Sequence, residues 1–322
     1  MAAGQGTHVW NDYNGNGIEE LDEFELAAFQ YEADHIKVYL TNNEYVNTYN
    51  NQLTQSVQLL PANLWSKPVG FRKFLSRFTD VLMFRSQLKD RKIELNPFYS
   101  HLEDTNLIFR NMMFTNTFSF NNSASKFAFD FIVRENRQKN LLYYGFEQTS
   151  LSLQQIVLKS APVPMLRLGA GYEHQLTDNA SEAMSSRCYT IRLHQVNGKV
   201  SLQFKNAYTF TADYIWQSGL ELKQNVPMFA HKATFTADLR FPKYGVVTAS
   251  MQYAHIRSTV LSNSSLAYVM LGGLSAGQNA LWSVQYQMSL NAFLQLALHY
   301  EGHFSQGHRA VHTGNVTVRA QF

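Results

Sequence analysis

Apolar and polar residues alternate along most of this chain from about residue 71 onward. In the segment 127–133, three phenylalanines and Val133 hold alternate positions, and Asp130 stands between them. Because side chains of a β-strand point to the two faces of a sheet in turn, such a segment predicts a strand with one apolar face. We expect about 12 to 16 such strands, many near the 9–11 residues with which a tilted strand crosses a bilayer.

The same alternation returns at fairly even intervals. It is found in segments 72–84, 166–173, 200–208, 229–241, 282–290 and 294–300. Gly, Asn, Ser and Pro gather between such segments and predict turns at 121–125, 195–199, 242–245, 262–265, 272–278 and 306–309. Aromatic residues that would form belts at the two membrane interfaces stand toward strand ends, at Tyr143, Tyr144, Tyr208, Tyr253, Tyr300 and Phe304.

The last residues of the chain form an amphipathic strand that ends on phenylalanine. Val316, Val318, Ala320 and Phe322 fall on one face, and polar residues fall on the other. This ending resembles that of bacterial outer-membrane β-barrel proteins. The resemblance implies that these four residues are a membrane-assembly signal read by the barrel assembly machinery.

Composition fits a barrel better than a helical membrane protein. Charged residues make up 16% of the chain and aromatic residues 14%, against about 25% charged residues in ordinary soluble domains. The mean hydropathy is −0.26, and no apolar run approaches the roughly 20 residues of a transmembrane helix. The net charge of +3 comes without a Lys/Arg cluster, so we expect no nucleic-acid partner.

The fold class that these patterns predict is an all-β transmembrane antiparallel β-barrel. We place the barrel at 67–322 and a distinct, more acidic segment at 1–66. Residues 1–10 lack a secretory signal, so either a signal was removed or the chain is the C-terminal portion of a longer protein with further N-terminal domains. We favour the second. A soluble β-sandwich or propeller also alternates and stays open as an alternative.

An EF-hand-like calcium loop is predicted at 12–23. The segment matches the pattern D-x-[DN]-x-[DN]-G-x5-E, in which oxygen ligands converge on one ion and a glycine permits the sharp turn. The predicted ligands are Asp12, Asn14, Asn16, Ile18, Glu20 and Glu23. Glu19 replaces the apolar residue usual at loop position 8, which argues against a paired EF-hand. The alternative is an Asn-Gly turn without an ion, before a short helix over 19–30.

Other candidate chemistry is weaker. His299, Glu301 and His303 share one strand face near His308 and His312, so a zinc site is conceivable, but a polar lumen explains them as well. No nucleophile elbow is present, and His231 and His255 are the nearest candidates for a barrel hydrolase. We therefore expect no enzyme. Arginines that could face the lumen and select anions are Arg167, Arg192, Arg240 and Arg319.

Several of these motifs together resemble the C-terminal β-barrel region of large outer-membrane proteins of the Bacteroidota. They stand at 12–18, 21–25, 272–279, 300–302, 312–314 and 318–322. The resemblance implies an outer-membrane barrel, a preceding region and no enzyme. His303 stands where a basic Arg would be expected after Tyr300-Glu301-Gly302, so no role is transferred to it.

The predicted function is passive. We expect an integral protein of a Gram-negative outer membrane that acts as a pore, an anchor or a surface-translocation component, with outer-membrane lipid as its surroundings and structural calcium as its cofactor. The alternative is a soluble or surface-exposed, calcium-stabilised, β-rich binding protein. Whether the protein needs detergent to stay monodisperse separates the two.

Overall fold

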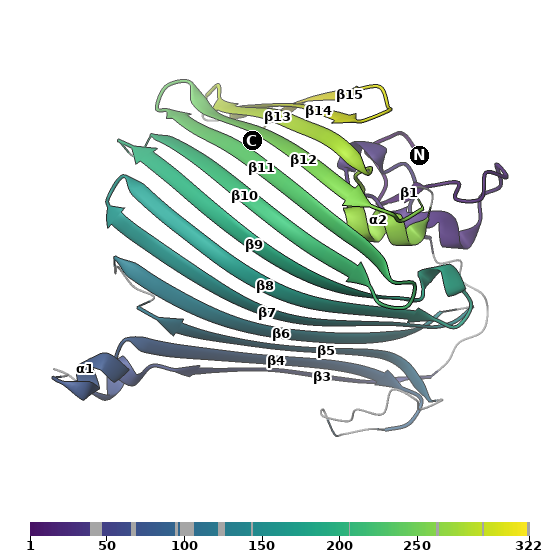
Figure 1. The fold of residues 1–322 in the computed structure, drawn as a ribbon, viewed down its shortest axis with the longest axis horizontal. Helices are drawn as coiled ribbons and strands as arrows, with labels where there is room; N and C mark the ends of the chain where they lie inside the picture. Colours follow the sequence, from purple (N-terminus) through teal and green to yellow (C-terminus); the bar gives the residue numbers. More distant parts are fainter. Residues whose placement is uncertain are drawn as a thin grey trace.

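One large antiparallel sheet dominates the structure. The computed structural model describes residues 1–38, 47–65, 69–93, 96, 106–121, 126–142, 144–205, 207–261, 264–291 and 293–320. In these residues thirteen strands follow one another in chain order, each hydrogen-bonded to the next (Figure 1). The expected all-β class with a barrel-type antiparallel sheet is confirmed, and the strand number lies in the expected range.

The strands are long enough to cross a bilayer, at 10 to 19 residues each. Their bounds are β3 (Tyr49–Leu59), β4 (Phe78–Asp90), β5 (Leu107–Phe120), β6 (Phe127–Leu142), β7 (Gly145–Val163), β8 (Leu166–Ser181), β9 (Tyr189–Phe204), β10 (Tyr208–Glu221), β11 (Val226–Phe241), β12 (Gly245–Ser258), β13 (Gly277–Ser289), β14 (Leu294–Ser305) and β15 (Val311–Ala320). The large sheet thus begins within the first 66 residues, at β3.

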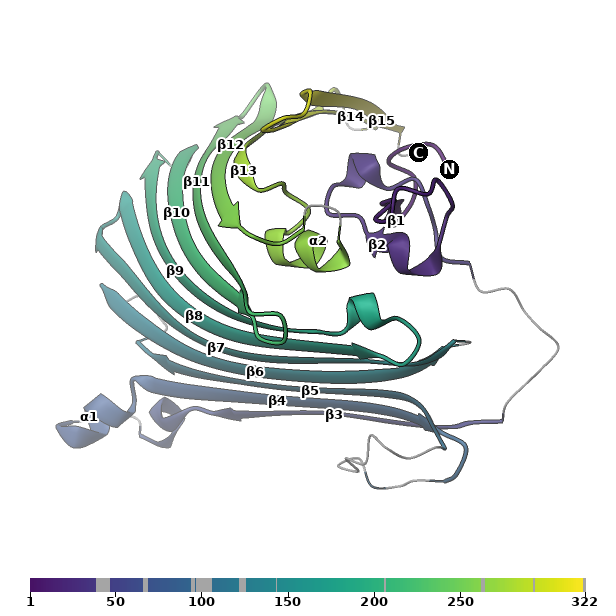
Figure 2. The same ribbon diagram turned by 45° about the vertical axis from the view of Figure 1, so that its right-hand side comes forward.

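The sheet curves strongly, as the wall of a barrel does. Figure 2 shows β3 and β15 at its two margins, with the other strands forming a continuous bend between them. Among the described residues, β3 pairs only with β4 and β15 pairs only with β14. The described wall is therefore open along one side.

The two faces of this wall differ sharply in polarity. Cross-strand partners form rows that run around the sheet. One row is Leu166, Leu202, Phe210, Ala237, Ala249, Val284, Tyr300 and Gly314. The adjacent row, one residue away on each strand, is Arg167, Ser201, Thr211, Thr236, Ser250, Ser283, Glu301 and Thr313. The sequence alternation has become an apolar face and a polar face.

The polar face is the concave one. Helix α2 (Ser265–Leu271) and the amino-terminal segment lie inside the bend (Figure 2), and they contact residues on the same strand face as the polar row, including Met228, Ile256 and His303. None of the described helices is long and apolar enough to cross a membrane.

The amino-terminal segment, residues 1–38, is a small unit of its own. Strand β1 (His8–Trp10) pairs with β2 (Phe24–Leu26), and two 3-10 turns follow the chain, η1 (Leu21–Glu23) and η2 (Gln30–Glu32). The helix expected over 19–30 is therefore wrong. Pairing of Trp10 with Phe24 and the bond from the Asn11 amide to the Glu23 carbonyl (3.0 Å) hold this stretch extended.

Two further local expectations differ from the structure. Residues 71–75 form helix α1, after the 3-10 turn η3 (Pro61–Leu64), rather than the start of a strand, because Phe71 and Phe74 stack at helical spacing. The turn expected at 195–199 lies inside β9, where Gly198 adjoins only open space and Asn197 fills the room left by Gly171.

Candidate functional site: an amino-terminal segment docked in the concavity

Helix α2 closes part of the concave face at one end of the strands. Its apolar side chains cover a patch that the neighbouring strands leave on the otherwise polar face. The cluster comprises Ile191, Met228, Ala230, Ala254, Ile256, Leu266, Ala267, Met270, Leu271 and Leu274. Ser264 caps the helix by accepting the Ala267 amide (3.1 Å), and Gly272 ends it in the left-handed conformation. Local sequence signals thus fold this connection back into the concavity.

The amino-terminal segment docks on α2 through one tyrosine. The hydroxyl of Tyr268 donates to the Leu26 carbonyl (2.7 Å) and accepts the Ala28 amide (2.6 Å). The chain after α2 approaches so closely that a Cβ at Gly273 would lie 2.4 Å from the Cβ of Ala28. Gly273 also has a φ of 76°, so glycine serves both the turn and the contact.

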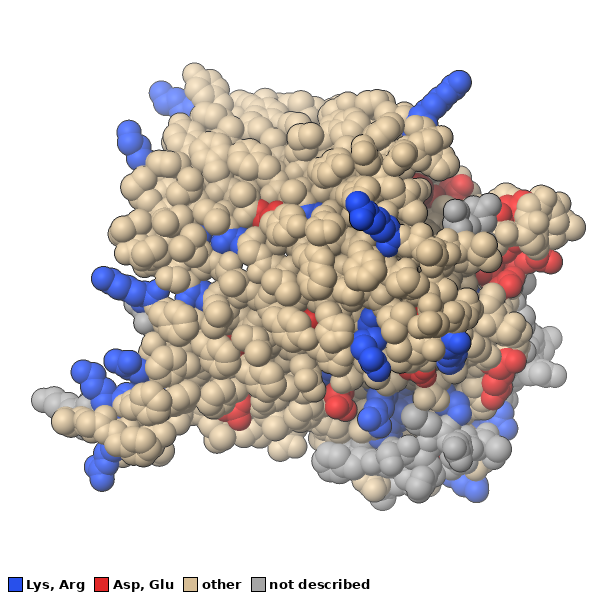
Figure 3. Space-filling view, in the orientation of Figure 1, with Lys and Arg blue, Asp and Glu red and all other residues tan. Residues whose placement is uncertain are grey.

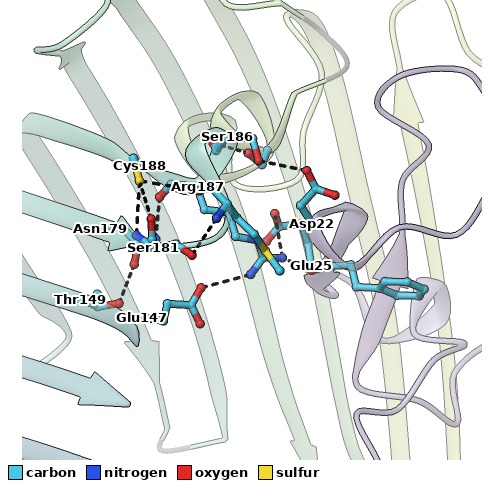
Figure 4. A network of polar contacts seen from close by, with 12 residues as sticks. Asp22, Glu25, Glu147, Thr149, Asn179, Ser181, Ser186, Arg187 and Cys188 are labelled. Carbon is cyan, nitrogen blue, oxygen red and sulfur yellow. Dashed lines mark hydrogen bonds and ion pairs between the residues drawn. The ribbon is translucent and has the colours of Figure 1, made fainter. Parts of the chain in front are cut away.

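Arg187 is the charged centre of the docking site. It ends the 3-10 turn η4 (Ser185–Arg187) between β8 and β9, and its guanidinium lies between Glu25 and Glu147 (Figure 4). The nitrogen–oxygen distances are 3.7 Å to Glu25 and 3.5 Å to Glu147. The same guanidinium donates to the Phe24 carbonyl. One side chain thus joins the amino-terminal segment to the wall.

A chain of polar contacts fixes the position of Arg187. Its carbonyl accepts the Asn179 amide group (2.7 Å), and the Asn179 oxygen accepts the Thr149 hydroxyl (2.7 Å). Next to it, the Cys188 thiol donates to the Ser181 carbonyl (3.3 Å). In Figure 4 these residues, which belong to β7, β8 and the β8–β9 connection, lie to the left of Arg187. These contacts therefore hold Arg187 where its guanidinium faces Glu25 and Glu147.

Burial opposes the charge of Glu25. Desolvation raises the pKa of this carboxyl above its ordinary value of 4.5, Arg187 acts in the opposite direction, and the carboxylate of Glu147 adds to the rise. Burial likewise raises the pKa of Glu32 and of the Tyr268 hydroxyl. Two acidic groups of the segment and one hydroxyl of α2 are thus partly withdrawn from water at the docking site.

Aromatic contacts hold the far end of the segment. Phe29 lies against the His303 ring (4.9 Å between centroids), and the Tyr31 hydroxyl is 2.7 Å from the His303 Nδ1. Between these residues and β12–β14 lies a cavity of about 210 Å³, lined also by Ser250, Gln252, Leu281, Trp282, Ser283, Glu301 and Gly302. His303 therefore contacts the docked segment.

The other histidine candidates do not assemble into a metal site. His299 pairs with Glu301 (3.1 Å) on the concave face, whereas His312 bonds to Tyr300 (2.9 Å) on the convex face. Within the described ranges, no three His, Cys, Asp or Glu side chains could hold a metal ion together. His231 and His255 are cross-strand partners on the convex face. Arg192 also falls on the convex face, by its pairing with Leu220, and not in the lumen.

The predicted calcium loop is folded as a tight turn. The Asp12 carboxylate accepts the amides of Gly15 (2.7 Å) and Gly17 (2.8 Å), and the Asn14 and Asn16 oxygens accept amides two residues on. Glu23 is buried, and its carboxylate accepts the Trp10 indole N–H (2.8 Å) and the Tyr13 amide (3.2 Å). The outer predicted ligands, Ile18 and Glu20, are exposed. Calcium binding stays a prediction.

The convex face is apolar and open. Phe235, Met251 and Val316 are 52%, 59% and 66% exposed there. Lys and Arg gather toward the ends of the strands, and the area between them is largely free of charge (Figure 3). Val316, Val318 and Ala320 of the predicted assembly signal lie on this face of β15, while Phe322, like Tyr143, lies outside the described residues. A soluble monomer rarely exposes so large an apolar surface.

Comparisons with known proteins leave the family open. No known family profile matches the chain, and no curated protein matches it. One solved structure similar to the chain is the crystal structure of the ferric citrate transporter FecA in the unliganded form, with 10% sequence identity and a TM-score of 0.48. The match covers 83% of this chain and 43% of that chain, so the chain spans less than half of that protein.

Proposed function

We propose that the sheet is part of the wall of an outer-membrane β-barrel, and that the docked amino-terminal segment narrows its lumen at one end. The wall would act passively, as a pore, an anchor or a component of a surface-translocation system, and the proposal includes no catalytic step. The observation that carries it is the pair of adjacent rows, one apolar on the convex face and one polar on the concave face.

The dimensions of the apolar face support this role. On β10 the convex-face aromatics extend from Tyr208, the first residue of the strand, to Trp216. The eight residue-to-residue steps from one to the other correspond to about 27 Å along a strand, or roughly 21 Å along the membrane normal at a tilt near 40°. An outer-membrane barrel has an apolar band about 25 Å tall between its aromatic girdles.

The remaining expectations belong to this proposal. Outer-membrane lipid would cover the convex face, and the barrel assembly machinery would recognise the strand that carries Val316, Val318 and Ala320. The resemblance to C-terminal barrel regions of large Bacteroidota proteins would make further N-terminal domains part of the same polypeptide. Calcium at Asp12–Glu23 would stiffen the docked segment and would take no part in transport.

A matched pair of substitutions tests the membrane wall. Ala249 and Ser250 are neighbours on β12, the first on the apolar row and the second on the polar row. Arginine on the lipid face near the bilayer midplane costs about 2–4 kcal/mol, so Ala249→Arg should strongly reduce folding into lipid vesicles. Ser250→Arg should cost much less. Equal effects of the two substitutions, or a wild-type protein that stays monodisperse without detergent, would overturn the proposal.

A further inference from the structure

The first and last strands of the large sheet run in the same direction. Every neighbouring pair from β3 to β15 is antiparallel. In a sheet of thirteen strands, this alternation gives the first and the thirteenth strand one direction. A direct seam between β3 and β15 would therefore be a parallel pair.

Neither margin has a partner strand within the described ranges. β3 and β15 each pair on one side only, and Val316 and Val318 on β15 are 66% and 59% exposed. In a bilayer, every unpaired backbone N–H or C=O group costs several kcal/mol. Bacterial single-chain barrels meet this constraint with an even number of antiparallel strands. Thirteen strands alone can close only through one parallel pair, and not through antiparallel pairs throughout.

A second copy of the chain does not solve the problem. Two copies with the same orientation in the membrane would place β15 of one against β3 of the other, which again makes parallel seams. Antiparallel seams between like strands, β15 with β15 and β3 with β3, would require one copy to be inverted across the membrane. Outer-membrane barrels are inserted with one orientation, with short turns on one side and longer loops on the other.

We propose that an odd number of amphipathic strands from polypeptide outside residues 1–322 closes the wall between β3 and β15. This inference rests on the proposed membrane function. The inserted strands must carry apolar side chains beside Val316 and Val57 on the convex face. They must carry polar side chains beside Thr317 and Ser56 on the concave face. With them, every seam is antiparallel and the total strand number is even.

Disulfide scanning in the native outer membrane tests the seam. In a Cys188→Ser background, Val316→Cys on β15 is combined in turn with Leu53→Cys, Gln55→Cys, Val57→Cys or Leu59→Cys on β3, all on one face. The control pair is Leu298→Cys with Val316→Cys, which are direct partners on β14 and β15. We expect the control disulfide and no disulfide between β3 and β15, within one chain or between copies.

Each other result has one meaning. A disulfide within one chain shows direct closure, and a disulfide between chains shows closure by a second copy; either overturns the proposal. Electron cryo-microscopy of the assembly purified from outer membranes supplies the count, which we expect to be even, with an antiparallel foreign strand beside both β3 and β15. An odd count overturns the proposal as well. The comparison of Ala249→Arg with Ser250→Arg tests the membrane role by itself, so failure of that role is distinguished from failure of the proposed closure.

Discussion

Replacement of Arg187 by alanine should release the amino-terminal segment from the wall. The guanidinium contacts Glu25, Glu147 and the Phe24 carbonyl, and these contacts join residues that are far apart in the sequence. Without it, two acidic side chains face each other in the docking site. The segment then keeps its contacts to Tyr268, His303 and Ser186.

The magnitude follows from the burial of the three charges. The side chains of Arg187, Glu25 and Glu147 are 18%, 13% and 22% exposed. Breaking a fully buried ion pair costs about 3–5 kcal/mol, but the distances here are long and the groups are partly hydrated. We therefore expect a loss of about 3 kcal/mol of docking free energy, which is about a hundredfold in the docking equilibrium.

Hydrogen exchange read by mass spectrometry measures this loss directly. Amides within residues 24–33 are protected by β2, by the Tyr268 contact and by the turn η2. Their protection in Arg187→Ala should fall by roughly two orders of magnitude, because local opening sets the exchange rate. Amides in the middle of β10 and β11 should exchange as in the wild type.

Arg137 provides the control. It also forms an ion pair, with Glu135 at 3.7 Å, but its side chain is 56% exposed and lies on β6, away from the docked segment. Arg137→Ala should leave residues 24–33 unchanged. If Arg187→Ala also leaves them unchanged, the guanidinium does not hold the segment, and the docking site as described is refuted.

Three further outcomes are expected. Tyr268→Phe removes both hydrogen bonds to the segment and should lower its docking free energy by about 1–3 kcal/mol, seen as faster exchange of residues 24–33; unchanged exchange would show that the hydroxyl is dispensable. Because the docked state raises the pKa of Glu25, it favours the protonated acid, so docking is strongest below pH 4.5 and weakens as the pH rises through the raised pKa. Over that range the exchange rate of residues 24–33, corrected for its intrinsic pH dependence, should increase in the wild type and increase less in Glu25→Gln. A decrease in the wild type would contradict this prediction. Chelation of calcium should speed proteolytic cleavage within 12–23 while the β-strands stay resistant, and a cleavage rate equal with and without chelator would remove the calcium assignment.

Alternation predicted the sheet well because it is a local property that the fold preserves. Segments such as 229–241 keep their apolar and polar positions on opposite faces in β11. Where a stretch satisfies two local patterns, the tertiary context decides. The predicted strand 72–84 included residues 72–75, yet Phe71 and Phe74 stand at helical spacing, and Phe74 packs on Phe78 and Phe120 from a helix.

The docking site could not be predicted from the sequence in the same way. Arg187 and Glu25 are separated by more than 160 positions, Arg187 belongs to no motif, and the motif at 21–25 that ends on Glu25 indicated no partner for it. Gly273 was part of a glycine-rich stretch that predicted a turn, but nothing in it indicated that Ala28 would press against it. Charge pairs and close approaches across the concavity depend on the curvature of the sheet, which sequence periodicity does not encode.

The margins of the sheet and the contacts of the docked segment are on different strands. The segment, α2 and the turn η4 occupy one end of the concavity. Two contacts join the segment to the turn: Asp22 accepts the Ser186 hydroxyl, and Glu25 pairs with Arg187. Because these contacts lie on strands β7 to β14 and not on the marginal strands β3 and β15, the closing strands can be added without replacing them. Closure of the wall and release of the segment are therefore separable, and a variant that releases the segment should still assemble into a complete wall.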